Sequence, residues 1–242
     1  MIMESCDNKK SICKSTLPTS IAIVAGLTLL GLFVSKGLTS IANQEQCVTV
    51  KGLAEREVLA NKVVWPLPYK CVSNDMQQLY QEIEKNREIV LSFLKNGGIT
   101  DNEIVISAPA VTDRLAQSYI PDNIKFRYQA EAVITVTSPQ VERVIELMGK
   151  QIELMKDGVI ISNEYNYQTQ FEYTALNDVK PAMVEEATRN ARAVAQKFAE
   201  DSDCRLGNIR QATQGQFSIS SDETTPQIKN IRVVTTVKYA LQ

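Results

Sequence analysis

The most apolar stretch of the chain lies close to its N-terminus. Residues 17–34 include no charged side chain, and their centre, Ile21–Val34, reads IAIVAGLTLLGLFV. A membrane-spanning helix needs about 20 residues, whereas the core of a signal peptide needs about 7–15, so this length lies between the two. We expect residues 17–38 to form a transmembrane anchor or an export signal. Lys36 interrupts the region in which cleavage would occur, which favours an uncleaved anchor.

Basic residues around this segment indicate its orientation. Lys9, Lys10 and Lys14 precede it, whereas only Lys36 follows closely. Because basic flanks tend to remain on the cytoplasmic side, we expect residues 1–16 to be a cytoplasmic tail. Residues 43–242 would then form a periplasmic domain, held in a bacterial inner membrane by a single pass.

Two alternating segments open the expected periplasmic domain. Residues 47–60 and 63–72 are predicted strands, and Asn61 between them is a good turn residue. We therefore expect these two strands to pair as a hairpin. Pro66 and Pro68 are two residues apart, so their missing N–H groups lie on the same side of the strand, which predicts an edge strand.

Three later segments show the apolar spacing that is typical of amphipathic helices. They lie at 75–95, 138–158 and 178–201, and the last is the most regular. The predicted core-facing residues of that last helix are Val179, Met183, Ala187, Ala191, Val194 and Phe198.

The remaining predicted strands lie between and after these helices, at 104–111, 125–136, 159–173, 206–220 and 228–241. A weak internal repeat runs through this order, because a helix, a glycine-containing turn and two strands occur at 75–137 and again at 177–241. The pattern predicts an α+β fold: a two-part domain of antiparallel sheet with about three helices packed on one side, preceded by one N-terminal transmembrane helix.

Composition limits the chemistry that this domain can perform. The chain contains no histidine, and its net charge is -2. Without histidine, the common Ser-His-Asp, Cys-His and zinc-hydrolase sites cannot form within the chain. The small net charge and the lack of a basic stripe argue against nucleic-acid binding. The sequence therefore favours a non-enzymatic protein, while carboxylate, lysine or tyrosine chemistry stays open.

Three cysteines follow the apolar segment: Cys47, Cys71 and Cys204. None belongs to a C-x-x-C pair, so neither a zinc ribbon nor a thioredoxin-like motif is predicted. The expected hairpin register places Cys47 opposite residue 74 and not opposite Cys71. We expect buried free thiols, with one disulfide among the three cysteines as the alternative.

Two clusters of charged residues have simple structural interpretations. Residues 101–103 lack the alternating oxygen ligands and the central glycine of a calcium loop, so they predict a turn. On the last helix, adjacent carboxylates do not share a face, so a paired acid–base device is not indicated. We interpret that cluster as a solvated helix surface, formed by Lys180, Glu185, Glu186, Arg189 and Arg192.

Aromatic residues are concentrated in the predicted strand 159–173. Tyr165, Tyr167, Phe171 and Tyr173 occupy odd positions and would point to one side, either into the core or as a partner-binding surface. Trp65 and Tyr69 are expected in the core. No catalytic, cofactor-binding or metal-binding residue is assigned, and no cofactor is expected.

Three segments together resemble a known family. They are VTVKGLAEREV at 48–58, LNDVKPAMVEEATRNARAVAQKFAEDS at 176–202 and IRVVTTVKYAL at 231–241. In order and spacing they resemble the SIMPL-domain proteins (domain of unknown function 541), most closely a bacterial branch with an N-terminal membrane segment. The resemblance implies an envelope or periplasmic protein. Some such proteins are linked to oxidative-stress defence, and no catalytic reaction is established for them.

These observations predict a membrane-anchored domain that acts in the periplasm by self-assembly or by binding a protein partner. An exposed strand edge favours a homo-oligomer, including a ring. The alternative is a redox-active or hydrolytic stress-defence enzyme that uses Cys71, Cys204 or a carboxylate. A third hypothesis is a small-molecule binding module with a cavity between helix and sheet.

Overall fold

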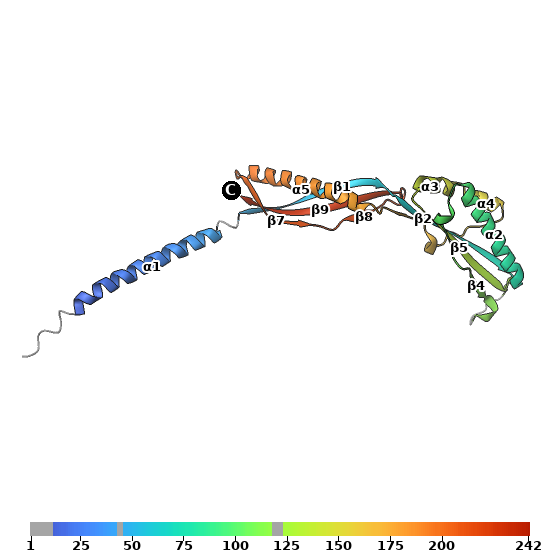
Figure 1. Ribbon diagram of the computed structural model, residues 1–242, viewed down its shortest axis with the longest axis horizontal. Helices are drawn as coiled ribbons and strands as arrows, with labels where there is room; N and C mark the ends of the chain where they lie inside the picture. Colours follow the sequence, from blue (N-terminus) through green and yellow to red (C-terminus); the bar gives the residue numbers. More distant parts are fainter. Residues whose placement is uncertain (1–11, 43–45, 118–122) are drawn as a thin grey trace, which may run out of the picture. The chain divides into compact units, whose positions relative to one another are not determined.

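The computed structural model describes residues 12–42, 46–117 and 123–242, and its domain has an α+β fold with antiparallel pairing (Figure 1). The helices are α1 (Ile12–Ala42), α2 (Met76–Asn96), α3 (Val141–Gly149), α4 (Ile152–Lys156) and α5 (Leu176–Asp201). The strands are β1 (Cys47–Leu59), β2 (Lys62–Ser73), β3 (Ile104–Ile106), β4 (Ala110–Asp113), β5 (Tyr128–Ser138), β6 (Gln170–Glu172), β7 (Leu206–Gln214), β8 (Ser218–Ser220) and β9 (Ile228–Leu241). The fold class predicted for the domain is thus confirmed.

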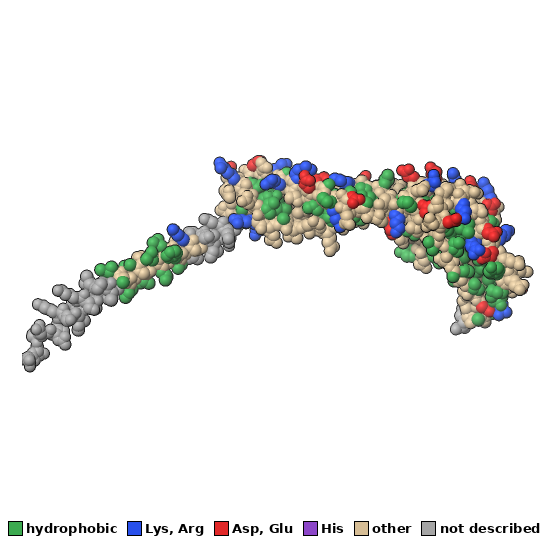
Figure 2. Space-filling model, in the orientation of Figure 1, with side chains coloured by type: hydrophobic (Ala, Val, Ile, Leu, Met, Phe, Trp, Pro, Cys, Tyr) green, Lys and Arg blue, Asp and Glu red, His purple; other side chains and the backbone are tan. Residues whose placement is uncertain are grey.

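Helix α1 contains the apolar segment. All the large apolar side chains from Ile21 to Val34 are at least half exposed, and Figure 2 shows hydrophobic side chains along this part of the helix. In the part of the chain that the structure describes, no helix has both the length and the apolarity needed to cross a membrane. Most of the expected cytoplasmic tail, residues 1–11, lies outside the described residues.

The chain divides into two compact units. One comprises the residues up to Gly52, together with Thr188–Gln214 and Thr235–Gln242. The other comprises Leu53–Ala187 and Gly215–Val234. Strands β1 and β9 and helix α5 therefore contribute residues to both units.

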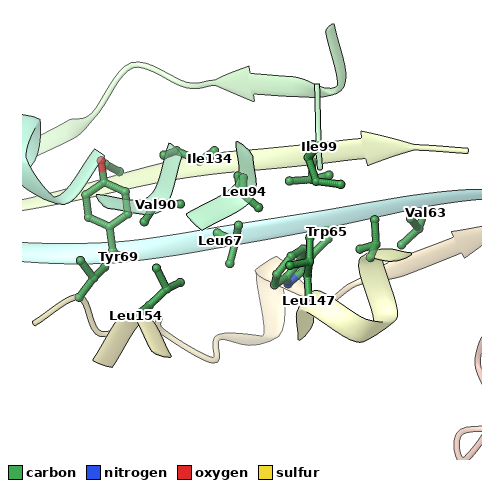
Figure 3. Packing of buried hydrophobic residues seen from close by; sticks show 14 of the residues in the cluster. Val63, Trp65, Leu67, Tyr69, Val90, Leu94, Ile99, Ile134, Leu147 and Leu154 are labelled. Atoms are coloured by element: carbon green, nitrogen blue, oxygen red, sulfur yellow. The ribbon is translucent and has the colours of Figure 1, made fainter. Parts of the chain in front are cut away.

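A five-stranded sheet and helices α2, α3 and α4 enclose the largest hydrophobic cluster, which lies in the second unit. β3 and β4 pair with one side of β5, β2 pairs with the other side, and β6 pairs with β2. Alternating side chains of β2, from Val63 to Cys71, are buried because strand side chains point to opposite faces in turn. Figure 3 shows this cluster, with Val90 and Leu94 contributed by α2 and Leu147 by α3.

Helix α2 begins and ends where its sequence indicates. The Asp75 carboxylate accepts hydrogen bonds from the N–H groups of Gln77 at 2.7 Å and Gln78 at 2.9 Å, which makes it the N-cap. Gly97 follows the last helical residue, and Gly98 has a φ of +85°, a conformation that glycine adopts without strain. The helix predicted at 75–95 is confirmed.

Helix α5 packs on a second sheet, in which β9 lies between β1 and β7 and also pairs with β8. The helix predicted at 178–201 is confirmed, but its buried side was predicted wrongly at two positions. Val194 and Phe198 are 40% and 54% exposed. The buried residues are spaced by four throughout: Met183, Ala187, Ala191, Ala195 and Ala199. A row with that spacing winds slowly around a helix and can follow a twisted sheet.

The two sheets are built from two copies of one pattern. β2, α2, β3, β4 and β5 form the first copy, in which the long β5 pairs with β2 on one side and with the two short strands on the other. In the second copy, β9 is placed in the same way between β1 on one side and β7 and β8 on the other, with α5 in the position of α2. The first copy is inserted between β1 and α5 of the second. The weak repeat in the sequence therefore reflects a nested repeat in the fold.

The predicted hairpin between the first two strands is wrong. β1 belongs to the sheet of β9, whereas β2 pairs with β5 and β6. Between β1 and β2, the N–H groups of Ala60 and Asn61 donate to the carbonyls of Gln227 at 2.8 Å and Glu172 at 3.0 Å. These hydrogen bonds to distant segments hold residues 60–61 in a crossover between the two sheets, so the chain does not turn back on itself at Asn61. The predicted register, with Cys47 opposite residue 74, is therefore wrong as well.

Three predicted elements are divided in the structure. The second helix splits into α3 and α4 near Lys150, the strand at 104–111 splits into β3 and β4, and the strand at 206–220 splits at Gly215 into β7 and β8. The strand predicted at 159–173 is largely wrong, because only β6 and an isolated bridge from Ile161 to Tyr69 have strand pairing. Its tyrosines occupy a 3₁₀ turn instead, η3 (Tyr165–Tyr167).

Candidate functional site

The side of the five-stranded sheet away from the hydrophobic cluster carries a groove of about 390 Å³, here called the outer-face groove. Val64 and Pro66 of β2 and Val133 of β5 supply apolar surface to it. The remaining lining residues come from three places. The stretch from β3 to β4 supplies Ser107, Ala108 and Ala110, and β5 also supplies Glu131 and Thr135. The stretch from η3 to β6 supplies Asn166, Tyr167, Gln168 and Gln170.

The prolines of β2 make one side of this groove rich in hydrogen-bond acceptors. The N–H of Ser162 donates to the carbonyl of Pro68 at 2.7 Å, so the carbonyl of Pro68 points away from β5. Pro66 lies two residues earlier and directs its carbonyl to the same side. Neither proline has an N–H group, so this stretch of β2 offers carbonyl oxygens without donors. The predicted edge strand is wrong, because β6 pairs with residues 62–64 of β2 and Ile161 forms a bridge with Tyr69, so that only the stretch around Pro66 has no strand on this side.

A charged cluster lies at the groove and joins β2, β5 and η3. Lys70 Nζ contacts a carboxylate oxygen of Glu164 and lies 3.8 Å from an oxygen of Glu131. The Tyr167 hydroxyl donates to Glu131, which raises the pKa of Tyr167. The hydrogen bond to Glu164 raises the pKa of Lys70 and so holds its ammonium group charged. One ammonium group thus faces two carboxylates, and only Glu131 of these two lines the groove.

Trp65 and Tyr69 lie in the hydrophobic cluster, as expected, on the opposite face of β2 from the groove. The Tyr69 hydroxyl donates to the carbonyl of Ile83 at 3.4 Å. Burial raises the pKa of Tyr69 to about 12. These two aromatic rings stabilise the fold and do not line the outer-face groove.

The four aromatic residues predicted to share one side of a strand are separated in the structure. Tyr165 is 87% exposed, and Tyr167 lines the groove. Phe171 packs against the cluster of the five-stranded sheet, whereas Tyr173 packs against a smaller cluster around Met183. The prediction failed because it assumed strand alternation over residues that form a 3₁₀ turn.

Cys71 and Cys204 are free thiols in different surroundings. Cys71 is 1% exposed, and Asn86 Nδ2 donates to its sulfur at 3.3 Å. Burial raises the pKa of the Cys71 thiol, which disfavours the reactive thiolate. Cys204 is half-buried, and its thiol donates to the carbonyl of Ser202 at 3.3 Å. A buried free thiol, as predicted, is confirmed at Cys71.

The charged clusters that the sequence suggested are structural. Residues 101–103 form a 3₁₀ turn in which the Glu103 carboxylate accepts from the N–H and the hydroxyl of Thr100. Partial burial would raise the pKa of Glu103, but hydrogen bonds from Ser138 and Thr100 outweigh it and lower this pKa. On α5, Arg189 and Arg192 are exposed, in agreement with a solvated surface. Among the described residues, no group of three Cys, Asp or Glu side chains is placed to hold a metal ion.

The outer-face groove was not predicted from the sequence. The charged pair beside it could have been noticed, because Lys70 of β2 and Glu131 of β5 are cross-strand partners on the face of the sheet that is not buried. Neither residue was assigned a role from the sequence. The contribution of Tyr167 could not be anticipated, because it depends on the turn that replaces the predicted strand.

The fold is an α+β domain made of two nested β–α–β–β copies, with a groove on one sheet. Its described residues form no catalytic arrangement that we identify. The chain belongs to the SIMPL family, described as a protein of unknown function (DUF541), whose model matches residues 48–239. The comparison with curated proteins gave no match. The family resemblance seen in the sequence is confirmed, while the bacterial branch and the membrane segment stay predictions.

Proposed function

We propose that this protein is anchored in the inner membrane of a bacterium and acts in the periplasm by self-assembly through the open edges of its four-stranded sheet. The observation that supports assembly is the strand order β1–β9–β7, because among the described residues no further strand pairs with the outer side of β1 or of β7. Residues 208–214 of β7 are exposed throughout. An open strand edge is a natural site for adding another strand.

The two edges favour a particular kind of assembly. β1 and β7 lie on opposite sides of β9, so the edge of β7 in one copy can meet the edge of β1 in the next. Such a head-to-tail contact uses two different surfaces and repeats from copy to copy. The assembly closes into a ring when a whole number of copies completes one full rotation. A ring-shaped homo-oligomer is therefore the form that we propose.

The apolar surface of α1 supports the proposed anchor. Nine large apolar side chains between Ile21 and Val34 are each more than half exposed and need a partner that removes them from water. The chain supplies lysines before this segment, and basic residues remain on the cytoplasmic side. The C-terminal domain then lies in the periplasm. A role in envelope stress defence is supported only by the family resemblance.

The alternative of a cysteine-dependent enzyme has less support. The burial of Cys71 and the raised pKa of its thiol work against a nucleophilic or redox role. A carboxylate enzyme would need an acid and a base in one site, and Glu131 and Glu164 instead share Lys70. We therefore base the proposal on assembly.

Mass measurement of the detergent-extracted protein over a range of concentrations tests the assembly. Alternation along β7 directs the N–H of Ala212 away from β9, because Gly215 donates its N–H to Val234 at 2.8 Å. The substitution Ala212→Pro removes an outward donor and leaves the bonds to β9 in place, so it should yield monomers. Ala212→Ser keeps the N–H and should assemble like the parent protein.

A parent protein that stays monomeric at high micromolar concentration would rule out the proposed assembly. Equal masses for the proline variant and the parent oligomer would show instead that another surface holds the copies together. Protease protection in spheroplasts tests the anchor separately. A periplasmic domain is digested by added protease, whereas protection of the domain, with a periplasmic control cut, contradicts the proposed topology.

A further inference from the structure

The outer-face groove combines apolar surface with an excess of acceptors. Val64, the ring of Pro66 and Val133 are half-buried in it. Its volume of about 390 Å³ is near the lower end of the range for ligand sites, roughly 300–1,000 Å³. The groove therefore suits a small ligand or a single side chain with an apolar stem.

Glu131 is the charged group of this groove, and its hydrogen-bonding capacity is only partly used. A carboxylate offers about four lone-pair positions. Tyr167 donates to Glu131, while Lys70 Nζ is 3.8 Å from the nearest Glu131 oxygen, beyond the distance of a normal hydrogen bond. The Glu131 side chain is 26% exposed, so it is partly shielded from water and still accessible.

The cationic side chains Lys70 and Arg114 form their hydrogen bonds with residues other than Glu131. Lys70 contacts Glu164, which accepts its hydrogen bond. Arg114 donates to Gln129, and it is not among the residues that line the groove. Two carboxylates facing one lysine leave the cluster with an excess of negative charge. A positively charged donor placed at Glu131 would balance that excess.

From these observations we propose that the outer-face groove binds a primary ammonium group on an alkyl stem, with the ammonium at Glu131 and the stem on Val64, Pro66 and Val133. The carbonyl of Pro66 lies on the acceptor-only side of β2 and supplies a second, neutral acceptor. The ammonium group has three donors and no acceptor, which matches a wall that lacks backbone N–H groups. This ligand class is independent of whether the protein assembles.

The alkylammonium group could come from a free diamine or from a lysine side chain of another protein. Cadaverine represents the first source, and Nα-acetyl-lysine amide represents the second. The uncharged 1,5-pentanediol has the same stem length as cadaverine and no ammonium group. Calorimetric titration of each probe into the full-length protein in a non-ionic detergent separates these cases.

We expect saturable binding of at least one amine with a Kd below about 1 mM, and no binding of the diol. Tighter binding of cadaverine indicates a free amine as the ligand, and tighter binding of the lysine derivative indicates a protein side chain. Absence of saturable binding for both amines, or equal binding of the diol, overturns the proposal.

Two substitutions with opposite effects test the placement. Glu131→Gln removes the negative charge and should weaken amine binding at least fivefold. Lys70→Gln removes the competing cation and should strengthen binding about threefold, a gain that general loss of structure cannot produce. Glu200→Gln, at an exposed position of α5, is the matched control and should leave the affinity unchanged. Equal affinities for the Glu131→Gln variant and the parent protein would place the amine elsewhere and refute the site.

Discussion

The row of alanines on α5 makes a sharp prediction, because neighbouring positions should respond oppositely to the same side chain. Ala195 is fully buried and packs in a cluster with Val50, Val237 and Tyr239, whereas Val194 is 40% exposed. The substitution Ala195→Leu adds three carbon atoms where the helix lies close to the sheet. Overpacking of that kind costs about 1–3 kcal/mol.

Val194→Leu is the matched control, because it introduces the same residue one position earlier. At a half-exposed site this change should alter the free energy of unfolding by about 0.5 kcal/mol or less. The helical spacing of the large apolar residues in the sequence predicts the reverse, because it places Val194 in the core. The pair of variants therefore distinguishes the two helix orientations directly.

Urea denaturation followed by far-ultraviolet circular dichroism measures both variants. Trp65 is the single tryptophan and is 2% exposed in the other unit, so its fluorescence reports that unit independently. The Ala195→Leu variant should unfold at lower urea concentration, while the Val194→Leu variant should overlay the parent protein. A larger loss for Val194→Leu than for Ala195→Leu would refute the packing of α5 described above.

Three further predictions concern the second unit and the thiols. Iodoacetamide should modify Cys204 faster than Cys71 in the native protein, and mass spectrometry of the digested protein would contradict the burial of Cys71 if the order were reversed. Asp75→Ala removes the N-cap of α2 and should cost about 1 kcal/mol in urea denaturation, whereas an unchanged midpoint would mean that the cap does not stabilise the helix. The folded-state pKa of Tyr69 is about 12 against an ordinary value of 10.0, so the folded state retains this proton longer and stability should fall between pH 10 and pH 12. Tyr69→Phe should reduce that fall, and an identical pH dependence in both proteins would argue against the shifted pKa.

Local pattern was sufficient where an element has one buried side and clear ends. β5 alternates strictly, and Ala130 to Val136 are buried at every second position, as the sequence predicts. Helix α2 has an N-cap at Asp75 and a glycine pair at its end, so both of its limits could be read from the sequence. In these elements propensity, capping and packing all favour the same structure.

Prediction failed where long-range pairing decides the structure. Asn61 is a good turn residue, but hydrogen bonds from Ala60 to Gln227 and from Asn61 to Glu172 direct the chain into a different sheet. No local signal distinguishes that crossover from a hairpin. On α5, large apolar residues were preferred as core candidates, whereas close approach to the sheet selects small ones such as Ala195. The groove depends on η3, so Glu131 could not be connected with Tyr167 from the sequence.

The nesting of one copy inside the other has a consequence for biosynthesis. β1 is made early, but its neighbour β9 is the last strand, and the N–H of Leu241 donates to the carbonyl of Gln46 at 2.8 Å. The inserted copy can fold while the chain is still growing, because domains generally fold from the N-terminal side during synthesis. The four-stranded sheet can form only after β9 has been made. A chain interrupted before β9 would thus contain a finished inserted copy but would lack the strand that joins β1 to β7, so it could not present these two edges to another copy.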